Sequence, residues 1–162
     1  MIRVGIGYDV HAFTPGRKLI LGGVEIGHDM GLLGHSDADV LTHALIDALL
    51  GAANLGDIGR QYPDSDPQYK DISSLLLLKK TGRTLEKNGY SLINADAVIA
   101  AELPKLSPYM PEMQRNLAEA LQAQPACIGV KATTQEQLGF IGRGEGIGAM
   151  CVALISKRTA SV

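Results

Sequence analysis

The segment from residue 37 to about residue 54 predicts a helix that is apolar on two sides, and this feature most constrains the fold. Ser36, directly before it, is a typical N-cap residue. At helical spacing the segment carries a core stripe formed by Leu41, Ala44, Leu45, Ala48, Leu49 and Ala52. Ile46 and Leu50 fall on the other side, beside His43. A helix with two apolar sides is covered on both, and a neighbouring subunit is one candidate for the second cover.

The remaining elements predict an α+β domain with two layers, in which helices pack on one face of a mixed β-sheet. Strands are expected at residues 2–10, 93–101, 128–132 and 147–156, a hairpin at 19–26, and further helices at about 72–88 and 111–123. The 162 residues fit one domain, 1–162. Residues 56–67 are too rich in glycine, proline and aspartate for regular structure, and long loops of this kind are often functional.

Composition and charge exclude several partners. The net charge is −2 and no basic run is interleaved with aromatic residues, so nothing favours nucleic acid or an anionic membrane. No apolar run reaches the roughly 18 residues of a membrane span, and the first residues lack the pattern of a signal peptide. Cys127 and Cys151 lack C-x-x-C spacing and are expected to be reduced core thiols, which predicts a cytoplasmic protein.

Asp9, His11 and His43 form a candidate metal site. Residues at i and i+2 of a strand point to the same side, so Asp9 and His11 can hold one ion together, and His43 would come from a helix packed across that strand. Aspartate and histidine are ligands for a divalent ion such as zinc, and three ligands leave a position open for a substrate. Asp39 and Asp47, at i−4 and i+4, could each accept the second N–H of His43. The alternative is a hydrogen-bonded pair in the core and an unrelated helical histidine.

Two further motifs have both a structural and a functional interpretation. His35 and Ser36 precede the helix, where they could simply cap it or could bind a phosphate at its N-terminus. The segment from Thr133 to Glu136 has the T-x-x-E pattern of a capping box. A threonine hydroxyl there could instead hold phosphoryl oxygens while Glu136 ligates a hard cation such as Mg²⁺, and Lys131 would add positive charge.

Together, these strings resemble the 2-C-methyl-D-erythritol 2,4-cyclodiphosphate synthase family of the non-mevalonate (MEP) isoprenoid pathway. The matching segments occur in the same order over almost the whole chain, at Gly7–Phe13, Gly31–Gly59, Tyr62–Pro67, Pro104–Pro108 and Val130–Ile147. No single motif is specific, whereas the ordered set is. The chain departs from the family pattern at Glu102 and Leu103, which affects how the base is recognised and leaves the reaction class unchanged.

The resemblance implies a homotrimer with active sites between adjacent subunits. It implies Zn²⁺ on Asp9, His11 and His43, and Mg²⁺ or Mn²⁺ on Glu136. The implied enzyme is a metal-dependent, cyclising phosphorus–oxygen lyase whose substrate is 4-diphosphocytidyl-2-C-methyl-D-erythritol 2-phosphate. The 2-phosphate attacks the β-phosphorus, CMP leaves, and the cyclic diphosphate forms. Such chemistry needs positioning and charge neutralisation, and no protein nucleophile.

The resemblance also implies roles for individual residues. His35 and Thr134 would steady the transition state as catalytic residues. The residues expected to bind substrate are Ser36, Asp57, Ile58, Gly59, Tyr62, Pro63, Asp64, Ser65, Asp66, Ala101, Glu102, Leu103, Pro104, Lys105, Leu106, Ser107, Thr133, Gln135, Phe140 and Arg143. Among them, residues 101–107 would form the cytidine pocket. Phe140, Arg143 and Glu145 would also face a cavity on the trimer axis, where an isoprenoid diphosphate could bind.

Two other functions remain open from the residues. One is a zinc-dependent diphosphate hydrolase, which would release CMP without a cyclic product. The other is a non-enzymatic trimeric module that is held together by zinc or binds an isoprenoid. The three-ligand site speaks against a purely structural zinc, since structural sites are usually closed by four protein ligands.

Overall fold

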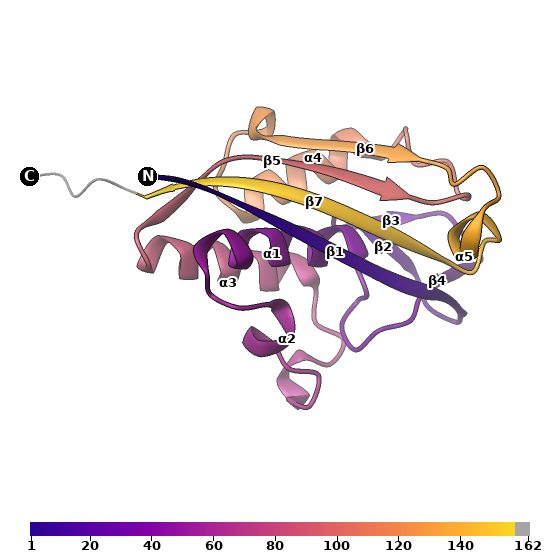
Figure 1. Ribbon diagram of the computed structural model, residues 1–162. Helices are drawn as coiled ribbons and strands as arrows, with labels where there is room; N and C mark the ends of the chain where they lie inside the picture. Colours follow the sequence, from indigo (N-terminus) through magenta and orange to yellow (C-terminus); the bar gives the residue numbers. More distant parts are fainter. Residues whose placement is uncertain (158–162) are drawn as a thin grey trace, which may run out of the picture.

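The computed structural model describes residues 1–157, which fold into a five-stranded mixed sheet with helices packed on one face (Figure 1). The sheet order is β4-β1-β7-β5-β6, formed by Met30–Leu32, Ile2–Pro15, Gly146–Lys157, Tyr90–Ala100 and Ile128–Thr133. All neighbours are antiparallel except β5 and β6, which are parallel. The long helices are α1 (Val40–Ala53), α3 (Ser74–Lys87) and α4 (Met110–Ala120). The predicted α+β architecture is confirmed.

Short elements complete the fold. A separate hairpin pairs β2 (Leu19–Leu21) with β3 (Val24–Ile26), as predicted. Single turns of helix occur at α2 (Ile58–Gln61), η1 (Pro67–Tyr69), η2 (Pro125–Cys127) and α5 (Gly139–Gly142). The segment 56–67 was expected to lack regular structure, and α2 corrects that expectation because Asp57 caps a turn by accepting from the N–H of Arg60. No helix in the described part of the chain is long and apolar enough to cross a membrane.

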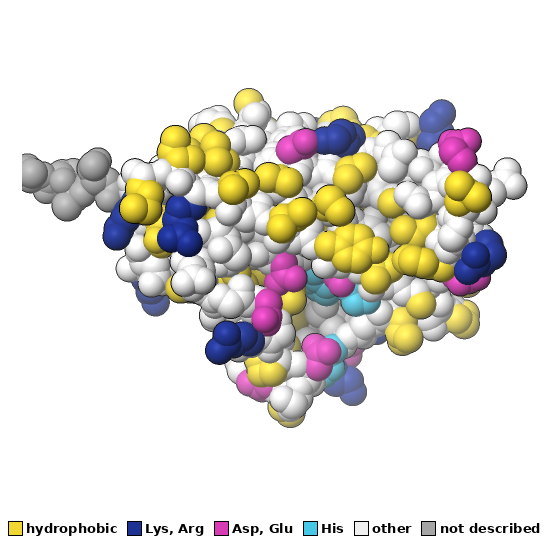
Figure 2. Space-filling view, viewed as in Figure 1, with side chains coloured by type: hydrophobic (Ala, Val, Ile, Leu, Met, Phe, Trp, Pro, Cys, Tyr) yellow, Lys and Arg dark blue, Asp and Glu magenta, His cyan; other side chains and the backbone are white. Residues whose placement is uncertain are grey.

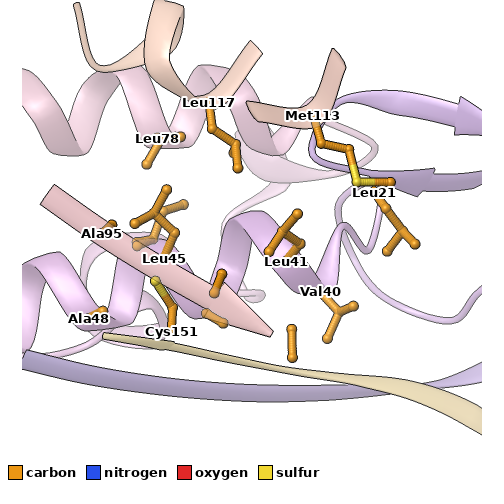
Figure 3. Close-up of a cluster of buried hydrophobic side chains, with 14 of the residues drawn as sticks. Leu21, Val40, Leu41, Leu45, Ala48, Leu78, Ala95, Met113, Leu117 and Cys151 are labelled. Carbon is orange, nitrogen blue, oxygen red and sulfur yellow. The ribbon is translucent and has the colours of Figure 1, made fainter. Parts of the chain in front are cut away.

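The core lies between the sheet and the helices, and α1 is buried on nearly all sides (Figure 3). Strand β7 shows the period-2 alternation of a sheet with one core face. Its inward residues are Ile147, Ala149, Cys151, Ala153 and Ile155, each at most 1% exposed. Ile46 and Leu50 of α1 are fully buried within the single chain. The second cover predicted for this helix therefore comes from the same chain.

Two glycines let α1 approach β1 closely. A Cβ built on Gly7 would lie 2.0 Å from the carbonyl oxygen of Ala44, and one built on Gly5 would lie 2.0 Å from the carbonyl oxygen of Ala48. Both obstacles are helix backbone, so no side-chain rearrangement can relieve them. The glycine excess of the sequence thus serves helix–strand packing at these two positions.

The outward face of the sheet is also apolar. Alternate residues of β1 and β7 point away from the helices and are between 39% and 66% exposed, namely Ile2, Val4, Ile6, Tyr8, Val10, Met150 and Val152. Figure 2 shows these hydrophobic side chains as a band that crosses the molecule. Monomeric soluble proteins rarely expose contiguous apolar patches of this kind without a partner.

The start of α1 differs from the prediction. The helix begins at Val40, and its N-cap is Asp39, whose carboxylate accepts from the N–H of Thr42 at 3.0 Å. Ser36 is not the cap, because Ala38 has a left-handed backbone (φ 58°) that no helix can pass through. Strand β1 also runs to Pro15, beyond the expected end at residue 10, because β4 pairs with its last three residues.

Candidate metal and ligand site

Asp9, His11 and His43 bring three ligand atoms together where β1 meets α1. The Oδ2 atom of Asp9 lies 2.9 Å from Nε2 of His11 and 3.0 Å from Nδ1 of His43, and the two ring nitrogens are 3.2 Å apart. The side chains of Asp9, His11 and His43 are 26%, 18% and 12% exposed. Asp9 and His11 lie on the same side of β1, as the i, i+2 spacing predicted. In Figure 2 the histidines (cyan) lie beside a recess below the apolar band.

The spacing of the three atoms fits a metal ion. Ligands placed tetrahedrally at 2.0–2.1 Å from zinc are roughly 3.3–3.4 Å apart, close to the 2.9–3.2 Å found here. Nδ1 of His11 lies 2.6 Å from the carbonyl oxygen of Leu33, which can only accept, so this nitrogen carries a hydrogen. In a neutral ring Nε2 then points a lone pair at the carboxylate of Asp9. Such a set of acceptors needs a positive charge between its members.

The pKa shifts of Asp9 and His11 also indicate that this site favours a positive charge. Burial alone would raise the pKa of Asp9, but hydrogen bonds and charges of His11 and His43 hold the pKa well below its usual range. For His11, burial acts to lower the pKa, and the hydrogen bond and charge of Asp9 together with the Leu33 carbonyl overcome this and raise it. The site therefore stabilises a cation at its centre, either a proton or a metal ion.

Neither predicted aspartate accepts the second N–H of His43. Nε2 of His43 lies 2.8 Å from Oγ of Ser74 and 3.1 Å from Oγ of Ser36. The carboxylate of Asp39 is fully buried and accepts from the N–H groups of Gly22 and Gly23 and from Thr42. That of Asp47 accepts from the N–H of Ile58 at 2.7 Å. Both aspartates thus tie α1 to neighbouring loops, and the prediction for them was wrong.

A cavity of about 220 Å³ opens beside the three ligands. It is lined by Asp9, His11, Gly34, His35, Ser36, His43, Ile58, Gly59, Tyr62, Asp64, Tyr69 and Leu77. Within residues 1–157, Nε2 of His35 is a buried polar atom without a hydrogen-bond partner. Buried polar atoms are rarely left unpaired, so His35 is placed to contact a ligand. Six residues predicted to bind substrate or act in catalysis therefore line the same cavity as the three candidate metal ligands, namely His35, Ser36, Ile58, Gly59, Tyr62 and Asp64.

A second cavity of about 270 Å³ contains the whole predicted cytidine segment. It is lined by Ala101, Glu102, Leu103, Pro104, Lys105, Leu106, Ser107, Met110, Ala132, Thr133 and Thr134. The carboxylate of Glu102 accepts from the N–H of Gln135 at 3.1 Å and so links the two loops that border this cavity. The two cavities have no lining residue in common. One chain therefore carries two separate groups of predicted site residues.

Glu136 does not belong to the Asp9–His11–His43 cluster. Its carboxylate accepts from the hydroxyl of Thr134 at 2.6 Å in an exposed loop. Thr133 donates to the carbonyl oxygen of Thr134, and the next helix, α5, begins only at Gly139, so the T-x-x-E segment does not form a capping box. Several other predicted residues line neither of the two cavities, namely Asp57, Pro63, Ser65, Asp66, Gln135, Phe140 and Arg143.

Four residues around the ligands were not predicted. Gly34, Tyr69 and Leu77 line the first cavity, and Ser74 contacts His43. Tyr69 packs edge-on against Tyr62, with ring centres 5.5 Å apart. A serine at the start of a helix carries no sequence signal for a contact with a residue 31 positions earlier, so Ser74 could only be found from the structure.

Comparisons with known proteins identify the family. Residues 2–156 match the model of the YgbB family. Proteins named 2-C-methyl-D-erythritol 2,4-cyclodiphosphate synthase are similar over nearly the full length. The one from Pelotomaculum thermopropionicum is 58% identical over 156 residues, 96% of each chain, and the one from Moorella thermoacetica is 58% identical over 159 residues, 98% of each.

Solved structures of similar proteins support the same family. The bifunctional IspDF of Campylobacter jejuni superposes with a TM-score of 0.93 at 46% identity; the match covers 97% of this chain and 42% of that longer protein. The IspF–CDP complex of Plasmodium falciparum superposes with a TM-score of 0.85 at 31% identity, over 98% of this chain and 97% of the other. The chain belongs to the 2-C-methyl-D-erythritol 2,4-cyclodiphosphate synthase family, as its ordered motifs predicted.

Proposed function

We propose that this protein converts 4-diphosphocytidyl-2-C-methyl-D-erythritol 2-phosphate to 2-C-methyl-D-erythritol 2,4-cyclodiphosphate and CMP. The observation that carries the proposal is the three-ligand site of Asp9, His11 and His43 at the edge of a cavity that also holds the unpartnered His35. This arrangement occurs in a chain whose relatives bear the name of that enzyme. Solved relatives are described as CDP complexes, which supports a cytidine diphosphate ligand.

The donor atoms fit the proposed metals. Asp9, His11 and His43 would hold Zn²⁺, and the carboxylate of Glu136 would hold Mg²⁺ or Mn²⁺ together with substrate phosphates. When bound, these ions supply positive charge that polarises the diphosphate. The second ion depends on Glu136 being brought near the diphosphate, since this residue lies outside the cluster of the other three.

The protein's own task in this reaction is positioning. An oxygen of the substrate's 2-phosphate forms a bond to the β-phosphorus, and the bond from that phosphorus to the oxygen that leaves with CMP breaks. His35 would donate a hydrogen bond to a phosphate oxygen from the wall of the first cavity, and Thr134 would hold the diphosphate from the second. Ile58, Gly59 and Tyr62 would surround the methylerythritol part, and Lys105 and its neighbours would hold the cytidine.

We also propose that the protein works as a homotrimer. The exposed apolar band on β1 and β7 supports an interface between copies. The division of the predicted residues between two separate cavities supports an active site completed by the cavity of a neighbouring subunit. Phe140, which is 41% exposed, and the ion pair of Arg143 with Glu145 at 2.6 Å remain the predicted contacts of an isoprenoid diphosphate on the trimer axis. The cytoplasm remains a prediction from the sequence.

Product analysis tests the reaction. The purified protein is incubated with the substrate, Zn²⁺ and Mg²⁺, and ³¹P NMR follows CMP and the cyclic diphosphate. Equal amounts of both products are expected. CMP with a linear product would identify the zinc-dependent hydrolase instead. A wild type without turnover, together with a His43→Ala variant whose only change is a lower melting temperature, would favour the non-enzymatic module.

Light scattering after size exclusion tests the assembly. The expected mass is three times the 17.2 kDa of one chain. A Val152→Asp variant places a charge in the apolar band and should lower this mass, whereas Lys79→Asp, an exposed change on α3, should leave it unchanged. A monomeric wild type would refute both the trimer and the shared active site.

A further inference from the structure

We infer that Ser74, held by Asp37, is a positioning residue that presents the Nδ1 lone pair of His43 to the metal. The inference rests on the proposed function only in taking the three ligands as a metal site. Ser74 is the first residue of α3 and is fully buried. Its hydroxyl lies between the carboxylate of Asp37, to which it is hydrogen-bonded, and Nε2 of His43 at 2.8 Å.

The direction of each hydrogen bond follows from counting hydrogens. A carboxylate has no hydrogen to donate, so the hydroxyl of Ser74 donates to Asp37. The single hydrogen of that hydroxyl is then used, and Ser74 Oγ can only accept from His43. Nε2 of His43 therefore carries the hydrogen, and in the neutral ring Nδ1 is left with the lone pair that faces Asp9 and His11. A histidine ligand needs this tautomer at its metal-binding nitrogen.

Asp37 is itself held firmly. Its Oδ2 atom accepts from the backbone N–H of Ser74 at 2.9 Å, and its Oδ1 atom accepts from the N–H of Asp39 at 3.3 Å as well as from the Ser74 hydroxyl. The carboxylate thus occupies the N-terminus of α3, where a negative charge is favourable. Its position is set by two backbone groups and does not depend on His43.

Ser36 cannot replace this arrangement. Its Oγ lies 3.1 Å from Nε2 of His43 and 3.5 Å from Oγ of Ser74, and it accepts from the N–H of Ala38 at 3.3 Å. Within residues 1–157, Ser36 makes no hydrogen bond to a carboxylate. Its own hydrogen is therefore not fixed: it can point at the ring, which would favour the opposite tautomer, or at Ser74 Oγ, which would not. Ser74, by contrast, has its hydrogen committed to Asp37. The contact through Ser74 is the one that determines the tautomer.

Asp37→Asn gives the sharpest test. The amide oxygen should keep the shorter backbone bond, from the N–H of Ser74 at 2.9 Å, and give up the longer one from the N–H of Asp39 at 3.3 Å, so the NH₂ group faces the Ser74 hydroxyl. Ser74 then accepts from the amide and turns its own hydrogen toward His43, whose Nε2 becomes the acceptor. Nδ1 acquires the hydrogen and no longer offers a lone pair to the metal. Loss of such an outer contact typically lowers metal affinity by about 10- to 100-fold.

Zinc affinity and the tautomer are measured in four proteins: wild type, Asp37→Asn, Ser74→Ala and the control Ser73→Ala. Ser73 is the exposed neighbour of Ser74, and its side chain makes no capping hydrogen bond. Competition with a chromophoric chelator gives the affinity for zinc alone. Long-range ¹H–¹⁵N spectra of the metal-free protein at pH 8 give the tautomer of His43, assigned with a His43→Ala spectrum. Thermal unfolding with excess chelator shows whether each variant folds.

We expect zinc affinity to be about 10- to 100-fold lower in Asp37→Asn and Ser74→Ala than in the wild type. Ser73→Ala should keep the wild-type affinity. His43 should carry its hydrogen on Nε2 in the wild type and on Nδ1 in Asp37→Asn. Unchanged affinity in both variants, or the same tautomer in Asp37→Asn as in the wild type, would overturn the inference. If cyclic product is never formed but these results hold, the positioning role stands and the proposed reaction fails.

Discussion

Replacing Gly7 with alanine should displace the helix that carries His43. The new Cβ would lie 2.0 Å from the carbonyl oxygen of Ala44 and 2.7 Å from the N–H nitrogen of Ala48, whereas real Cβ contacts essentially never fall below 3.0 Å. Helix α1 and strand β1 must therefore separate by at least about 1 Å. Ala44 directly follows His43 in α1, and Gly7 lies two residues before Asp9 in β1. The separation therefore acts directly on the metal ligands.

The size of the effect follows from this geometry. Overpacking a core costs about 1–3 kcal/mol, and we expect the upper end, near 3 kcal/mol, because the obstacle is backbone. Metal–ligand distances are held to within about 0.2 Å, so a shift of roughly 1 Å between His43 and Asp9 should lower zinc affinity by at least about 100-fold. Gly27→Ala is the matched control, since its Cβ would meet nothing nearer than 3.9 Å.

Urea unfolding in excess chelator measures the stability of the metal-free protein, and chelator competition measures zinc binding. Gly7→Ala should lower both the free energy of unfolding and the zinc affinity, and Gly27→Ala should change neither. A Gly7→Ala variant within about 0.5 kcal/mol of the wild type would show that the helix does not press on the strand. A variant that loses stability but keeps wild-type zinc affinity would show that packing and metal binding are independent.

Four further predictions concern stability, thiol chemistry and zinc binding. Asp39→Ala should lower the free energy of unfolding by about 3 kcal/mol, because α1 loses its cap and two N–H groups of the β2–β3 turn lose their acceptor. Urea unfolding measures this loss, and the exposed substitution Asp29→Ala is the control. Burial raises the pKa of the Cys151 thiol from 9.0 to about 12. As the pH rises above 9, the unfolded chain therefore loses this proton while the folded protein keeps it, so the wild type should lose stability relative to Cys151→Ala. In the native protein at pH 8, a thiol reagent should modify the half-buried Cys127 and spare Cys151, and unequal labelling should vanish in urea. Zinc should raise the melting temperature of the wild type and leave that of Asp9→Asn nearly unchanged, and an equal rise in both would contradict the assigned ligands.

Much of the fold could be predicted because the apolar periodicity is strong. The helical spacing from Leu41 to Ala52 defined the stripe of α1 that packs on the sheet, and the alternation in β7 defined a strand with one core face. Strand β4 was missed because Met30–Leu32 is too short to show a period, and it exists through its pairing with the end of β1. Local pattern thus predicts long elements, while short ones depend on neighbours that the sequence does not reveal.

The start of α1 shows why capping was misassigned. Ser36 and Asp39 are both good N-cap residues, so propensity alone cannot choose between them. Asp39 caps the helix because the turn at Gly22 and Gly23 brings two N–H groups to its carboxylate. Ser36 instead turns its hydroxyl toward His43. The choice depends on contacts between distant segments.

The cluster of Asp9, His11 and His43 could be predicted as candidate metal ligands, whereas the residues that contact these side chains could not. The spacing of Asp9 and His11 is a local property of a strand, so it is visible in the sequence. The partner of His43 was expected at i±4 on the same helix, but the structure supplies Ser74 from another helix. Glu136 was expected to act near the same substrate and lies outside the cluster. Its contribution depends on the proposed neighbouring subunit.

The sheet order has a consequence for how the chain assembles during synthesis. Strand β1 pairs along its length with β7, from Ile2 opposite Ser156 to Ala12 opposite Gly146. The ribosome must therefore make almost all of the described residues before β1 has its main neighbour. Until then the apolar strand that carries Asp9 and His11 lacks its sheet, and such edges are prone to aggregation. A chain stalled before β7 should consequently expose β1 as an apolar strand without its main partner, the kind of surface that chaperones bind.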